Sequence, residues 1–209
     1  MLVNSIIKYL HFIKIKFSFS QIIQFLLLCL ILFVFEIKPV LCQTGYVIIN
    51  NVKMYISPSS YVNINNHLKI TEGTGDLTLD SCNLYISGDF TINGNFSANI
   101  SNTHFTGNLP STNITGSQSI EFYNLIMNKN SSENYLIPEI NININNNAVL
   151  YNGKLQINDI LFLVKKDLYN YNTSVLENNA SLPNFLKVEG NVINDAELNN
   201  SGWFEIGVE

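Results

Sequence analysis

Residues 84–101 read Leu84-Tyr-Ile-Ser-Gly-Asp, Phe90-Thr-Ile-Asn-Gly-Asn, Phe96-Ser-Ala-Asn-Ile-Ser. Each of these three six-residue units opens with two apolar residues two positions apart. In a β-strand, such residues point to the same face. The Gly-Asp and Asn-Gly dipeptides that follow are turn formers. We therefore expect short strands joined by tight turns, with Leu84, Ile86, Phe90, Ile92 and Phe96 buried together and Tyr85 and Thr91 pointing outward.

The same spacing recurs along most of the chain after residue 43, and between Val47 and Phe96 successive pairs begin 6 to 9 residues apart. No stretch after Phe35 sustains the 3.6-residue period of a helix, so the pattern predicts an almost entirely β chain. The remaining pairs are Val47/Ile49, Met54/Ile56, Val62/Ile64, Leu68/Ile70, Leu77/Leu79, Ile120/Phe122, Leu125/Met127, Tyr135/Ile137, Ile142/Ile144, Ala148/Leu150, Leu155/Ile157 and Leu161/Leu163.

Two architectures fit short strands. An antiparallel β-sandwich has strands of five to six residues and turns every 8–12 residues. The shorter spacing of 6 to 9 residues between apolar pairs favours a parallel β-helix, and the irregularity of that spacing favours a right-handed β-helix. Asparagine supplies 32 of the residues from Gln43 onward, and asparagines stacked at coil corners can form amide ladders. We predict a β-solenoid over residues 43–164 and further, more irregular β-rich coils over 165–209.

The N-terminus has the features of a signal peptide. Residues 1–21 contain three lysines and no acid, and the 14-residue run Ile22–Phe35 has one polar member. That run is short for a membrane span, which needs about 20 apolar residues. We predict a signal peptide over residues 1–42 with cleavage between Cys42 and Gln43; an uncleaved anchor is the alternative. The expected location is secreted or cell surface, or periplasm in a bacterium.

Charge and cysteine content exclude several functions. From Gln43 onward the chain has 15 acids against 7 lysines and no arginine, so nucleic acid is not an expected partner. Contact with a membrane is expected only through the N-terminal segment. Cys82 is the one cysteine after the predicted cleavage site, so no internal disulfide forms and Cys82 is interpreted as a core residue.

Three segments carry a family resemblance: Asn83–Phe96, Asn113–Lys129 with its Ile-Thr-Gly and Phe-Tyr-Asn-Leu-Ile-Met-Asn-Lys phrases, and Ile142–Ile157. Residues 46–164 resemble the Asn/Gly-rich repeat segments of large secreted surface proteins of Bacteroidetes, which are exported by the type IX route. The resemblance implies a β-helical, adhesin-like segment without an assigned activity. The sorting domain usual in that family is not found before Glu209, which is typical of a truncated segment.

Candidate chemistry is sparse. Asp76, Asp80 and Asp89 form the closest acid cluster and are the best enzymatic candidates, although Gly-Asp turns also explain them. His67 and His104 stand alone and are interpreted as structural. We assign no catalytic, cofactor-binding or metal-binding residue and no cofactor. A carbohydrate-active enzyme would gather at least two acids and a Lys or His in one groove, whereas a structural stalk would show Asn ladders.

Outward-pointing side chains and the C-terminal end of the chain indicate which partners to expect. Outward tyrosines such as Tyr85 could stack on sugar rings, so a glycan or another surface protein is a possible partner. Residues 188–206 are interpreted as strands, not as a polar cap, and the end around Trp203, Phe204 and Ile206 predicts self-association. Seven Asn-x-Ser/Thr sequons matter only in a eukaryotic host. The expected function is an exported non-enzymatic structural or adhesin-like surface segment; a carbohydrate-active β-helix enzyme and a glycan-binding module are the alternatives.

Overall fold

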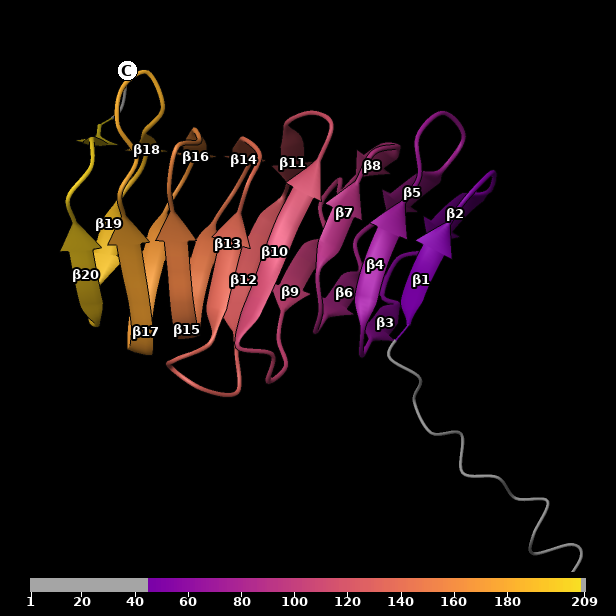
Figure 1. The fold of residues 1–209 in the computed structure, drawn as a ribbon, viewed down its shortest axis with the longest axis horizontal. Coiled ribbons are helices and arrows are strands. Elements are labelled where there is room, and N and C mark those ends of the chain that lie inside the picture. Colours follow the sequence, from indigo (N-terminus) through magenta and orange to yellow (C-terminus); the bar gives the residue numbers. More distant parts are fainter. Residues whose placement is uncertain (1–44, 208–209) are drawn as a thin grey trace, which may run out of the picture. The chain divides into compact units, whose positions relative to one another are not determined.

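The computed structural model describes residues 45–207, so the predicted signal peptide and its cleavage site lie outside the described residues. Within that range the chain forms 21 short strands and no helix (Figure 1). Every strand pair is parallel, and each strand pairs with the strand one coil further along. The prediction of a parallel β-solenoid is therefore confirmed, and the antiparallel sandwich is wrong.

The strands line up in three walls. The first wall contains β1 (Tyr46–Ile49), β4 (His67–Ile70), β7 (Phe90–Ile92), β10 (Ser111–Gly116), β13 (Tyr135–Pro138) and β20 (Glu197–Asn200). The second contains β3 (Tyr61–Ile64), β6 (Asn83–Ile86), β9 (Asn102–Phe105), β12 (Asn124–Asn128) and β19 (Val192–Asn194). The third contains β2 (Lys53–Ile56), β5 (Asp76–Leu79), β8 (Asn95–Ser97), β11 (Ile120–Phe122), β14 (Ile142–Ile144), β16 (Phe162–Val164), β18 (Leu186–Val188) and β21 (Phe204–Ile206).

Two long strands belong to two walls each. The first residues of β15 (Ala148–Ile157) pair with β12 in the second wall, and its last residues pair with β13 in the first. β17 (Leu168–Asn178) repeats the arrangement one coil later. Gly153 has a positive φ of 104° at the bend of β15, a conformation that glycine adopts without a steric cost.

The coil length follows from the strand register. Tyr46 pairs with His67, Ser111 with Tyr135 and Tyr135 with Lys154, which are steps of 21, 24 and 19 residues. The described residues complete about seven turns. Three strands at a spacing of 6 to 9 residues make up one such coil, so the apolar pairs seen in the sequence correspond to the strands of successive walls.

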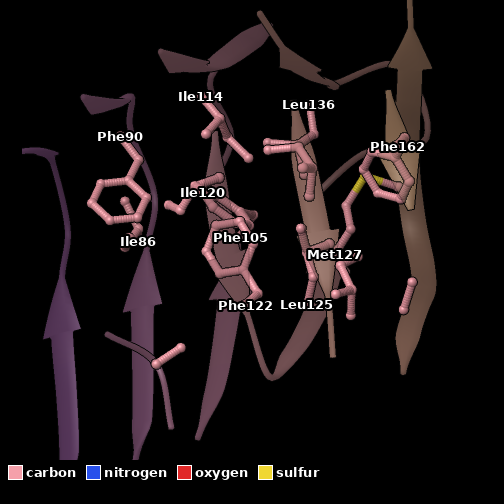
Figure 2. Packing of buried hydrophobic residues seen from close by; sticks show 14 of the residues in the cluster. Ile86, Phe90, Phe105, Ile114, Ile120, Phe122, Leu125, Met127, Leu136 and Phe162 are labelled. Carbon is pink, nitrogen blue, oxygen red and sulfur yellow. The ribbon is translucent and has the colours of Figure 1, made fainter. Parts of the chain in front are cut away.

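The interior is filled by the apolar pairs, as Figure 2 shows for its central part. Leu84, Ile86 and Phe90 are fully buried and Ile92 is 3% exposed, as predicted. Phe96 is the exception because it is only half-buried. In the third wall β8 ends one sheet and β11 begins the next, and a hollow of about 150 Å³ lined by both strands lies beside the Phe96 ring.

Two predicted pairs have the wrong phase. In β13 the structure buries Leu136 and Pro138, and Tyr135 and Ile137 point outward. In β16 it buries Phe162 and Val164 instead of the leucines on either side of Phe162. Both stretches have four consecutive apolar or weakly polar residues, so alternation alone cannot select the inward face.

The C-terminal region continues the same walls. β15 pairs with β17 over nine registered positions, and β18 pairs with β21, so residues 165–206 extend the solenoid without a break. The strands expected between Val188 and Ile206 are confirmed. The interior here becomes partly polar, because Asn170, Ser174 and Asn178 are buried and bond to one another or to neighbouring coils.

Candidate functional site

A ladder of asparagine side chains runs along one corner of the solenoid, at the start of the second-wall strands from β6 onward. Asn102 donates to Asn83 and Asn124 donates to Asn102, at 2.9 and 2.8 Å. Asn124 then accepts from the backbone N–H of Asn147 and from the side chain of Asn146. The Asn ladder predicted from the sequence is therefore present.

Two more rungs extend the ladder. Asn147 accepts from the backbone N–H of Asp167, and Asp167 accepts from both the backbone and side-chain N–H of Asn191. These hydrogen bonds lower the pKa of Asp167, with the backbone N–H of Asn191 as the main cause. The six positions Asn83, Asn102, Asn124, Asn147, Asp167 and Asn191 thus join six successive coils through side-chain bonds.

An aromatic row lies beside the ladder on the outer face of the second wall. Tyr85 is sandwiched between Tyr61 and His104, with ring centroids 4.4 and 4.1 Å apart. Both faces of the Tyr85 ring are therefore covered by protein. At the other end of the wall, Tyr171 stacks between Tyr169 and Tyr151. Sugar stacking on these rings would have to use the outer rings of each stack.

The two histidines are built into coil-to-coil contacts. His104 lies 3.3 Å from Asn83 Oδ1, and burial lowers the pKa of its ring to about 4, so the ring is neutral at pH 7. His67 Nδ1 accepts a hydrogen bond of 2.9 Å from the backbone N–H of Asp89, and the His67 ring lies against the Tyr46 ring with centroids 4.8 Å apart. Both roles are structural contacts within the wall.

The three candidate acids do not come together. Asp76 begins β5 and Asp80 follows its last residue, about 13 Å further along the extended chain. Asp80 accepts from the Tyr55 hydroxyl at 2.7 Å, and Asp89, before β7, accepts from the backbone N–H of Asn113. Among residues 45–207 no group of three His, Cys, Asp or Glu side chains is placed to hold a metal ion.

A polar groove of about 290 Å³ lies beside the first wall. The loop before β13 and the bend in β17 form its sides. Its charged residues, Glu133, Lys154, Glu177 and Glu197, were not singled out in the sequence. A neighbouring hollow shares Glu177 and is otherwise lined by asparagines and Ser201. The remaining residues lining the groove are Ser132, Asn172, Thr173, Ser174 and Val175.

Lys154 is the one lysine that lines this groove. Its ammonium donates to Glu133 at 2.8 Å and lies 5.4 Å from the centroid of the Tyr135 ring. The hydrogen bond to Glu133 is the main cause that raises the pKa of Lys154. With Lys154 paired to Glu133, Glu177 and Glu197 supply the remaining carboxylate oxygens, which can accept hydrogen bonds from hydroxyl groups.

A second lysine is buried inside the solenoid. Lys129 is 1% exposed, and its ammonium donates to the Thr106 carbonyl at 2.9 Å and to the Thr112 hydroxyl. Burial lowers its pKa to about 8, and the charge of Asp89 opposes that shift. Lys129 thus bridges neighbouring coils through neutral oxygens, and the burial of its charge has a cost in stability.

Comparisons with protein families, curated proteins and solved structures give no match to this chain. In the part that the structure describes, no helix is long and apolar enough to cross a membrane. Six of the seven sequon asparagines are exposed, and Asn113 is half-buried in β10.

Proposed function

We propose that the protein is an exported, non-enzymatic structural or adhesin-like segment of the cell surface. One observation carries the proposal: the ladder from Asn83 to Asn191 uses its amide groups and the Asp167 carboxylate to bind coil to coil. Side chains hydrogen-bonded in this way stabilise the stack of coils, and few of their polar groups are left to bind a substrate. The aromatic row supports the same interpretation, because Tyr85 is covered on both faces by its neighbours.

Export rests on the N-terminal sequence. The basic residues 1–21 and the apolar run Ile22–Phe35 support secretion, and cleavage after Cys42 would release the solenoid. The resemblance to secreted surface repeats of Bacteroidetes supports the same destination. An antibody against the solenoid, applied to intact cells that produce the protein, should label their surface.

The adhesive role is tested by attachment. Deleting the gene should reduce attachment of the cells to a surface or to other cells, and the purified exported protein should release no sugar from a panel of polysaccharides. Release of oligosaccharides, abolished by Glu177→Gln, would instead identify an enzyme. Labelling found only after the cells are permeabilised would contradict a surface location.

The groove around Lys154 favours a second candidate, a glycan-binding module. It contains three carboxylates and a lysine within one hollow, which is the composition expected above of a carbohydrate-active enzyme, and the same carboxylates can accept hydrogen bonds from sugar hydroxyls without catalysis. A glycan array probed with the exported protein should give a signal that the double variant Glu177→Gln, Glu197→Gln loses. Glu139→Gln, an exposed acid that does not line the groove, is the matched control. Equal binding by both variants would exclude the groove.

A further inference from the structure

Exposed apolar side chains gather at the two ends of the described solenoid. Nine of the twelve large exposed ones belong to the first coil, residues 46–64, or to the last, residues 192–206. They are Tyr46, Val47, Ile48, Val52, Met54, Tyr55, Tyr61, Trp203 and Ile206. Exposed apolar side chains concentrated at the ends in this way indicate an interaction site.

At the first coil, which we call the head, interior positions are open. Val47 shares a strand face with buried Ile49, and Met54 shares one with buried Ile56, yet they are 42% and 37% exposed. At the last coil, which we call the tail, Val192, Leu198 and Phe204 pack on the core from one side and stay half-exposed. Each end is thus a cross-section of the hydrophobic interior.

The strand edges at the two ends match wall by wall. Among the described residues, β1, β2 and β3 at the head each pair with one strand only, and so do β19, β20 and β21 at the tail. All strands within a wall run in the same direction. A tail placed on a head would therefore continue every wall with parallel pairs: β20 with β1, β21 with β2 and β19 with β3. Free edges of this kind are templates for such pairing.

The charges of the two ends are also complementary. Lys53 is the one charged residue of the head, residues 46–64, whereas the tail, residues 192–206, carries Asp195, Glu197 and Glu205. Inside the stack, Lys187 of β18 already pairs with Glu205 of β21 at 3.2 Å. In a continued third wall, Lys53 of β2 would lie on the strand next to Glu205. Opposite charge favours head on tail over head on head.

We propose that copies of this protein associate head to tail, the first coil of one copy docking on the last coil of the next. The interface is heterologous, so it leaves a free head and a free tail and permits growth into a filament. In the proposed interface, the two chains contact each other as neighbouring coils do within one chain, through parallel strand pairs and packed apolar side chains. This assembly goes beyond the proposed surface role, because it does not depend on any ligand.

The test uses two variants of the exported protein, each altered at one end. Met54→Glu places a carboxylate on the head, opposite the acidic tail, and Ile206→Glu adds one to the tail. Sedimentation velocity should show concentration-dependent association of the wild type, weakened about tenfold or more in either variant alone. A 1:1 mixture should form a dimer that grows no further, because it unites the one intact tail with the one intact head.

Ile100→Glu is the matched control, because Ile100 is 59% exposed in the turn between β8 and β9, away from both ends, and its variant should associate like the wild type. Circular dichroism checks that all variants keep the β fold. A wild type that stays monomeric at the highest soluble concentration overturns the proposal. A mixture that stays monomeric, or single variants that still polymerise, also overturns it.

Discussion

The buried lysine predicts an unusual dependence of stability on pH. Lys129 has a pKa of about 8 in the folded protein against an ordinary value of 10.5, so folding disfavours its charged form. The folded pKa is the lower of the two, so between pH 8 and 10.5 the unfolded chain holds the proton that the folded chain has lost. Stability therefore rises with pH in this window.

The fall of the Lys129 pKa from 10.5 to about 8 corresponds to roughly 3 kcal/mol that is lost from stability while the folded lysine stays charged, below pH 8. Between pH 7.5 and 9.5 the linkage relation recovers roughly 2 kcal/mol of it. The window stops at pH 9.5 because burial raises the pKa of Tyr85 above 10.0, and above pH 10 that shift acts in the opposite direction.

The assay is urea unfolding of the exported protein, followed by far-ultraviolet circular dichroism at pH 7.5, 8.5 and 9.5. The wild type should gain roughly 2 kcal/mol of unfolding free energy across this range. Lys129→Met removes the titrating group and should give a nearly flat profile. A wild-type profile that is flat or falls, or an equal slope in Lys129→Met, would refute the assignment of the shift to Lys129.

Three further predictions follow from the core, the ladder and the presequence. Phe90→Ala should lower the unfolding free energy by about 3–5 kcal/mol, since the ring is fully buried; a loss below 1 kcal/mol in urea melts would contradict this. Asn124→Ala breaks three ladder bonds and should cost about 1–3 kcal/mol, whereas exposed Asn128→Ala should cost under 0.5; equal losses would argue against the ladder. N-terminal sequencing of the exported protein should begin at Gln43, and an intact segment 1–42 recovered with membranes would support the anchor instead.

Much of the fold could be predicted from the sequence, because the interior of a solenoid repeats one local rule. Alternation places Ile86 and Phe90 inside, and the Gly-Asp and Asn-Gly turns set the strand length. The rule failed at Phe162, where apolar residues occupy both faces of the strand and the choice depends on the coils above and below. It failed at Phe96 because the break between β8 and β11 is a tertiary feature without a local signal.

The groove could not be found by searching for residues close in sequence. Glu133, Lys154, Glu177 and Glu197 are about 20 residues apart, and only the coil repeat brings them to one place. Searching for charged residues at intervals of 19–24 positions would have found them. Asp76 and Asp80, in contrast, are four positions apart with β5 between them, and the extended strand holds the two carboxylates apart although they are close in sequence.

Residues 45–207 form one continuous solenoid, and its first and last described strands each pair on one side only. Amide hydrogen exchange on the exported protein, diluted until it is monomeric, measures this continuity strand by strand. Protection should be high and continuous from β4 through β18, crossing residue 165 without a drop, and should fall at Tyr46–Ile49 and Phe204–Ile206. Protection that ends near residue 164, or end strands as protected as the centre, would contradict it.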